Sequence, residues 1–170
     1  IGCEADKEMA DVWYKKALAA MQYVEQKKKN TYLEYRIGKM YQYGLGTEEN
    51  LEQAGEWFSK AAAKEHKYAL YSLGMLYLQG KGVEQDEETA YSLLFRSYSK
   101  GNPYAAYELG KLYETGCGTE KNQEKSENCY RVAFLGFLNL EKRSKDDTLW
   151  YRSGCMYLHG IGTEADETKA

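Results

Sequence analysis

A glycine pattern that recurs along the chain constrains its fold more than any other feature. Four segments follow the order apolar-Gly-x-x-Tyr-x-x-Gly-x-Gly, with serine at the apolar place in the last one: residues 37–46, 73–82, 109–118 and 153–162. Their final glycines are 36, 36 and 44 residues apart, and Gly2 lies 44 residues before Gly46. A period of about 20–50 residues is typical of solenoids, in which each unit buries the face that its neighbour exposes.

Each repeat contains the signals of two helices. The glycines that can close a first helix in the left-handed conformation are Gly44, Gly80, Gly116 and Gly160. The Asp or Asn residues that can cap a second helix are Asp6, Asn50, Asp86, Asn122 and Asp166. We therefore predict first helices near residues 31–43, 67–79, 103–115 and 147–159. The predicted second helices lie near residues 6–28, 50–65, 86–100 and 122–141, with another starting at Asp166.

Glycine also recurs in the middle of each first helix, at Gly38, Gly74, Gly110 and Gly154. Glycine costs about 1 kcal/mol relative to alanine there. The missing side chain would let a neighbouring helix approach, and we expect small residues of the second helices to face it. Two second helices carry about two extra turns, which fall within residues 21–30 and 135–147.

The motifs resemble the Sel-1-like repeat family, a relative of the tetratricopeptide repeats, and Ala69–Ala90 and Trp57–Ala62 match its pattern. The resemblance implies an all-α fold, a right-handed α/α superhelix of helix-turn-helix repeats. We predict a single array over residues 1–170. Its parts are a partial repeat 1–30, repeats 31–66, 67–102 and 103–146 (the last with a lengthened second helix), and a partial repeat 147–170. The chain opens with Ile1 and stops inside a predicted helix, so we expect further repeats or domains of the same polypeptide.

The composition excludes several classes of function. Lys and Arg number 23 against 26 Asp and Glu, a balance that argues against nucleic-acid binding and against a polybasic membrane surface. We find no apolar run long enough to cross a bilayer and therefore expect no membrane insertion. The Gly-x-Gly loops lack the strand and the Lys-Ser/Thr of a phosphate-binding loop. His66 and His159 lack partners at metal-ligand spacing, and we predict no metal, no cofactor and no catalytic site.

The cysteines are Cys3, Cys117, Cys129 and Cys155. We interpret them as buried free thiols of a reducing, cytoplasmic compartment, while a Cys117–Cys129 bridge stays an alternative.

The family resemblance also implies that first helices line a concave, partner-binding face. Three registers should point there: six and three residues before the mid-helix glycine, and one after it. The predicted binding residues are Tyr32, Tyr35, Lys39, Tyr68, Tyr71, Met75, Tyr104, Tyr107, Lys111 and Tyr151, and Thr148 and Cys155 complete the registers. Tyrosines are good anchors for a peptide, and the lysines could hold its carboxylates. The alternative is that the same tyrosines only pack between helices.

The leading hypothesis is therefore a non-enzymatic scaffold that binds a protein or peptide. Two alternatives remain open at this point: the regulatory or targeting arm of a larger enzyme, and a purely structural spacer.

Overall fold

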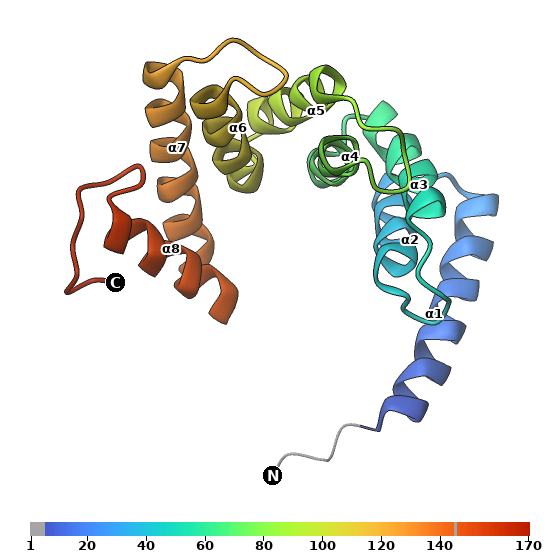
Figure 1. The fold of residues 1–170 in the computed structure, drawn as a ribbon. Coiled ribbons are helices and arrows are strands. Elements are labelled where there is room, and N and C mark those ends of the chain that lie inside the picture. Colours follow the sequence, from blue (N-terminus) through green and yellow to red (C-terminus); the bar gives the residue numbers. More distant parts are fainter. Residues whose placement is uncertain (1–5, 145) are drawn as a thin grey trace. The chain divides into compact units, whose positions relative to one another are not determined.

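The computed structural model describes residues 6–144 and 146–170, so the predictions on Gly2 and Cys3 lie outside the described residues. Within this part the chain forms helices and no strand, as predicted (Figure 1). The helices are α1 Lys7–Lys27, α2 Thr31–Tyr43, α3 Leu51–Ala63, α4 Lys67–Gln79, α5 Glu87–Ser99, α6 Pro103–Thr115, α7 Gln123–Glu141 and α8 Asp147–His159. The even-numbered helices are the predicted first helices, and the odd-numbered helices are the second ones.

The predicted start and stop signals act as expected. Asn50 accepts a hydrogen bond from the Gln53 amide at 2.9 Å, and Asp86 accepts one from the Thr89 amide at 3.0 Å. Gly44, Gly80, Gly116 and Gly160 are all left-handed C-caps. The segment after Asp166 differs from the prediction, because residues 167–169 form a turn instead of a helix.

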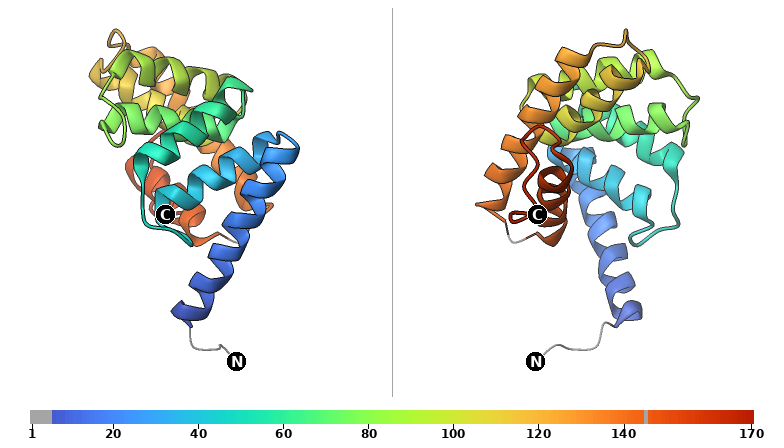
Figure 2. Two further views of the ribbon diagram at one scale, coloured as in Figure 1. Left: turned by 90° about the vertical axis from the view of Figure 1, so that its right-hand side faces the viewer. Right: turned by 60° about the vertical axis from the view of Figure 1, so that its left-hand side comes forward.

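The chain divides into two compact units, Ile1–Gln85 and Asp86–Ala170, called unit 1 and unit 2 below. In unit 1, Leu18, Ile37 and Met40 form a core cluster between α1 and α2. The long α1 extends past α2 at its N-terminal end (Figure 2). In unit 2, buried residues of α6, α7 and α8 form a second cluster, which includes Phe134, Phe137 and Met156.

The mid-helix glycines allow close helix packing, as predicted, and both rings and small residues meet them. A Cβ atom on Gly38 would lie 2.6 Å from the Phe58 ring, and one on Gly110 would lie 2.6 Å from the Tyr130 ring. The prediction did not include these rings. The predicted small residues also face the glycines, since Ser126 donates a hydrogen bond to the Gly110 carbonyl at 2.8 Å and a Cβ atom on Gly154 would lie 2.8 Å from the Ala170 carbonyl oxygen.

Candidate functional site

In unit 1, three rings of the predicted face region pack on one another. The Tyr35 ring centroid lies 6.1 Å from that of Tyr68 and 4.8 Å from that of His66, and the His66 and Tyr68 centroids are 6.1 Å apart. Burial raises the pKa of Tyr35 to about 12. His66 also caps α4, since its Nδ1 accepts a hydrogen bond from the Ala69 amide at 3.2 Å. Tyr35 and Tyr68 therefore contribute to helix packing at this place.

Among the other predicted residues of unit 1, only Tyr32 is clearly more exposed. Tyr32 is 58% exposed, and Tyr71 and Met75 are half-buried. Lys39 is half-buried and donates a hydrogen bond to the Tyr43 hydroxyl at 2.9 Å. These side chains leave polar and aromatic groups accessible on α2 and α4.

In unit 2, the equivalent place is a pocket of about 580 Å³ between α6, α7 and α8. We call it the α8 pocket. Its lining residues are Tyr107, Phe137, Asp147, Thr148, Tyr151, Arg152, Cys155, Met156 and Ile161. Two predicted binding residues, Tyr107 and Tyr151, thus meet in one pocket, together with Thr148 and Cys155 of the same registers. Most of the walls are apolar or aromatic, which is typical of sites that bind ligands or anchor side chains.

The floor of the α8 pocket is deeply buried. Phe137 is fully buried and Met156 is 2% exposed. Phe137 lies in the extra turns of α7, and its ring centroid is 5.1 Å from that of Tyr104 and 6.5 Å from that of Tyr107. Tyr104, another predicted binding residue, therefore supports the pocket floor from behind and does not line the pocket.

Ile161 reaches the α8 pocket because two glycines shape the loop after α8. Gly160 and Gly162 both have positive φ angles, of 64° and 69°. A Cβ atom on Gly162 would collide with the Tyr130 backbone, so this loop presses directly against α7. The glycine motif that defines the repeat thus also positions one wall of the site.

Cations lie over the tyrosine rings of the first helices. Lys39 lies 4.3 Å from the Tyr43 ring centroid, Lys67 lies 5.0 Å from that of Tyr68, and Lys111 lies 4.9 Å from that of Tyr107. The guanidinium of Arg152 lies 5.5 Å from the Tyr104 centroid. Lys111 also forms an ion pair with Glu108 at 3.0 Å. These contacts give the predicted binding residues a local positive charge in a chain that is acidic overall.

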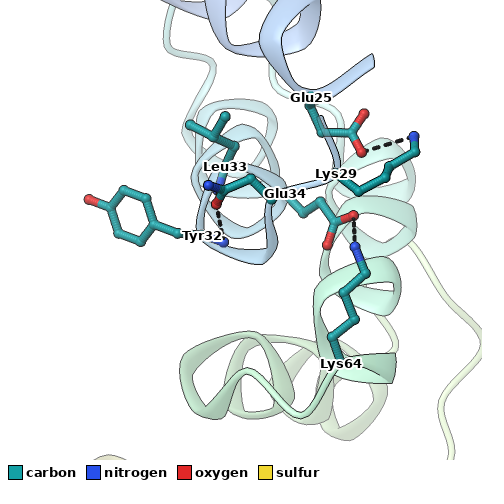
Figure 3. A network of polar contacts seen from close by, with 7 residues as sticks. Glu25, Lys29, Tyr32, Leu33, Glu34 and Lys64 are labelled. Atoms are coloured by element: carbon teal, nitrogen blue, oxygen red, sulfur yellow. Dashed lines mark hydrogen bonds and ion pairs between the residues drawn. The ribbon is translucent and has the colours of Figure 1, made fainter. Parts of the chain in front are cut away.

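A buried acid lies close to the predicted residue Tyr32. Glu34 is 2% exposed, and its Oε1 pairs at 2.6 Å with Lys64, the C-cap residue of α3 (Figure 3). Glu25 of α1, also 2% exposed, pairs with Lys29 at 3.0 Å. The Tyr32 ring points away from this network in Figure 3. The network joins α2 to α3 and leaves Tyr32 available on the surface.

A larger hollow of about 750 Å³ lies beside the start of α7. Its walls are mainly polar and include Glu114, Glu127 and Arg131. The Tyr130 hydroxyl donates to Glu114 at 2.8 Å, and burial raises the pKa of that hydroxyl. Water satisfies such walls as well as a ligand would, so the smaller, apolar α8 pocket is the stronger candidate.

The cysteine prediction is partly wrong. Cys117, Cys129 and Cys155 are free thiols, which contradicts the Cys117–Cys129 bridge. Cys129 is buried as expected, whereas Cys117 and Cys155 are only half-buried because they lie in a loop and in the α8 pocket.

Neither histidine belongs to a metal site. Within residues 6–144 and 146–170, no group of three or more His, Cys, Asp or Glu side chains could hold a metal ion. No helix of that part is long and apolar enough to span a membrane.

Sequence reasoning missed the residues that turn a row of tyrosines into a pocket. Phe137, Asp147, Arg152, Met156 and Ile161 belong to none of the predicted registers. Two signals were available. The repeat that contains α7 is eight residues longer than the 36-residue unit, and Thr148 interrupts the tyrosines that stand six residues before the mid-helix glycine.

Comparison with known proteins agrees with the glycine pattern. The Sel1 repeat model matches residues 32–66, 67–102, 103–134 and 151–170, which is well over half of the chain. A search of curated protein sequences found no match.

Two solved structures are similar over almost the whole chain. One is a protective antigen present in uropathogenic Escherichia coli strains that displays an SLR fold, with 26% identity, a TM-score of 0.69 and 92% of this chain covered. The other is a Sel1 repeat protein from Oxalobacter formigenes, with 26% identity, a TM-score of 0.64 and 93% covered. The aligned region spans 32% of the first protein and 64% of the second. The predicted all-α solenoid class is confirmed.

Proposed function

Because the chain belongs to the Sel1 repeat family, we propose that it binds a partner polypeptide on its first helices and acts as an interaction scaffold. Sel1 repeat proteins are generally protein-interaction scaffolds and are typically non-catalytic. The observation that carries the proposal is the α8 pocket, where Tyr107 and Tyr151 border an apolar hollow of about 580 Å³. Aromatic side chains around a desolvated pocket are typical of binding hot spots.

The two exposed tyrosines of the predicted registers offer the cleanest test, since their loss should not disturb the core. Tyr32 is 58% exposed and Tyr151 is 75% exposed. The double variant Tyr32→Ser, Tyr151→Ser should lose partner proteins that the unchanged chain captures from a cell extract, identified by mass spectrometry. Removing a hot-spot side chain costs about 2 kcal/mol or more, which is a loss of more than tenfold in affinity.

A matched control removes equally exposed aromatic rings outside the predicted registers. Tyr23 is 63% exposed on α1 and Trp150 is 52% exposed on α8. The variant Tyr23→Ser, Trp150→Ser should capture the same proteins as the unchanged chain. If the Tyr32, Tyr151 variant keeps its circular dichroism spectrum and still captures those proteins equally, the first helices are not the binding surface.

A further inference from the structure

The α8 pocket arises where unit 2 lacks two of the three rings that fill the same place in unit 1. Thr148 occupies the register of Tyr68, and the cap residue Asp146 occupies that of His66. Tyr107 keeps the register of Tyr35. The two small residues cannot fill the space that rings fill in unit 1, so the wall above Phe137 stays open.

The dimensions of the α8 pocket fit one large side chain and the backbone on either side of it. Its volume of about 580 Å³ lies within the usual range of ligand pockets, roughly 300–1000 Å³. Ile161 and the rings of Tyr107 and Tyr151 offer apolar surface above the buried Phe137 and Met156. An aromatic or large aliphatic residue would therefore gain most from entering the pocket.

Two charged side chains of opposite sign line the α8 pocket, and both belong to α8. Asp147 is the first residue of α8, where its carboxylate interacts favourably with the positive end of the helix dipole. Arg152 lies five residues later, a rise of about 7.5 Å along the helix. Among the described residues, the Arg152 guanidinium lies 5.5 Å from the Tyr104 ring centroid, and no ion pair with a carboxylate involves it. The five N–H donors of a guanidinium match a carboxylate in a bidentate arrangement, so Arg152 suits an acidic ligand.

We propose that the α8 pocket binds a large apolar side chain of a partner polypeptide and that Arg152 binds an acidic residue next to it. This inference rests on the proposed function and specifies the chemistry of the partner. Asp147 repels a second acid, so it fixes the side on which the acidic residue lies. The positive charge of Arg152, which lies over the neighbouring Tyr104 ring, favours the same acidic partner.

The test begins with selection from a displayed library of random twelve-residue peptides on the full 170-residue chain. Peptides that also bind the variant Thr148→Tyr are removed, because a tyrosine there restores the ring that unit 1 has. The enriched peptides should share a large apolar residue with Asp or Glu within two positions. A synthetic copy should bind the variants Thr148→Tyr and Arg152→Glu at least about tenfold more weakly than the unchanged chain.

Charge reversal on both sides tests the role of Arg152 directly. Changing the acidic residue of the synthetic peptide to Lys should weaken its binding to the unchanged chain and strengthen its binding to Arg152→Glu. The variant Thr115→Tyr adds the same ring at an exposed position outside the pocket and should bind the peptide normally. Thermal unfolding of each variant shows that it is folded before binding is measured.

Cysteine alkylation locates the bound peptide. Cys155 lines the α8 pocket, whereas Cys117 is equally half-buried in a loop away from it. The peptide should slow alkylation of Cys155 several-fold and leave that of Cys117 unchanged.

The proposal is overturned if selection yields no peptide that binds the unchanged chain better than it binds Thr148→Tyr. It is likewise overturned if the enriched peptides lack the apolar and acidic pair, or if Cys155 is not protected. It is also overturned if Cys155 protection rises with protein concentration alone, because a second copy would then fill the pocket. Any of these results leaves the test with Tyr32 and Tyr151 unaffected, so failure of this inference and of the proposed function can be told apart.

Discussion

The α2–α3–α4 region of unit 1 and the α6–α7–α8 region of unit 2 have the same repeat pattern but different interiors. In the first, α3 has 13 residues, and the rings of Tyr35, His66 and Tyr68 pack together. In the second, α7 has 19 residues, and the corresponding place is the α8 pocket. The comparison teaches that a pocket replaces a ring cluster in this Sel1 repeat array where the second helix is longer and small residues stand in place of rings.

The largest expected effect concerns a feature that both regions share, an aromatic ring packed against the mid-helix glycine. Phe58 in α3 and Tyr130 in α7 occupy the same register, and each fills the space above a mid-helix glycine. Phe58→Ala should destabilise the protein by about 3–5 kcal/mol, because Phe58 is fully buried and the rigid glycine helix cannot close the cavity. Urea denaturation measures the loss, and amide hydrogen exchange should place it in unit 1.

A matched control is Phe95→Ala on α5. The Phe95 side chain is 44% exposed, so its removal should cost only about 1 kcal/mol or less. A loss for Phe58→Ala as small as that for Phe95→Ala would mean that the ring does not fill the glycine space. Loss of exchange protection spread equally over both units would show that the units unfold together.

The sequence predicted the repeat architecture well because it depends on local signals. Glycine, Asp and Asn act within one or two turns of the chain, so helix bounds such as Thr31–Tyr43 and Asp147–His159 agree with the prediction residue by residue. The turn after Asp166 shows the limit of such signals, since a cap alone does not offset the cost of nucleating a helix.

The second expected effect concerns a charge that unit 1 has and unit 2 lacks. Glu34 stands four residues before the mid-helix glycine, where unit 2 has the fully buried Ala106. Lys64→Met should cost about 1–3 kcal/mol, because it leaves the buried carboxylate without its ion pair. Glu34→Leu should change the free energy of unfolding by less, or stabilise the protein, since leucine fills the equivalent place at Leu70. Chemical denaturation shows which variant loses more free energy of unfolding. A larger loss for Glu34→Leu than for Lys64→Met would mean that the ion pair stabilises the protein more than a leucine would.

The third effect makes unit 1 resemble unit 2. Tyr68→Thr removes the ring that packs on Tyr35 and His66, and should cost about 1–2 kcal/mol. The control Tyr23→Thr changes a tyrosine that is 63% exposed and should cost a few tenths of a kcal/mol. Differential scanning calorimetry compares the two. Equal transition temperatures would mean that the ring cluster contributes nothing to stability, and that unit 1 could lose it without consequence.

The candidate site was only partly predictable, because it depends on contacts between helices that are distant in the sequence. The registers identified Tyr107 and Tyr151, since a position on one helix face follows from helical periodicity. They could not show that Phe137 would come to lie beneath Tyr107, because this depends on how the lengthened α7 packs on α6. They also could not separate Tyr104, which packs against Phe137, from Tyr32, which is exposed.

The smallest expected effect is a pH dependence near neutral pH that comes from His66 of unit 1, whose register Asp146 occupies in unit 2. Burial, with a further contribution from Lys67, lowers the pKa of His66 below its ordinary value of 6.5 in the folded protein. The unfolded chain therefore takes up the proton more readily, so the contribution of neutral His66 to stability is present above pH 6.5 and is lost as the pH falls below it. The effect should be well below that of Tyr68→Thr, because His66 is only half-buried and solvent screens its charge. His66→Asn should reduce the fall in urea midpoint between pH 7 and pH 5 (about the titration range of histidine), since Asn102 caps the first helix α6 from the same register and does not titrate. His159→Asn, an exposed control, should keep the fall, and an unchanged pH dependence in His66→Asn would assign the titration to other groups.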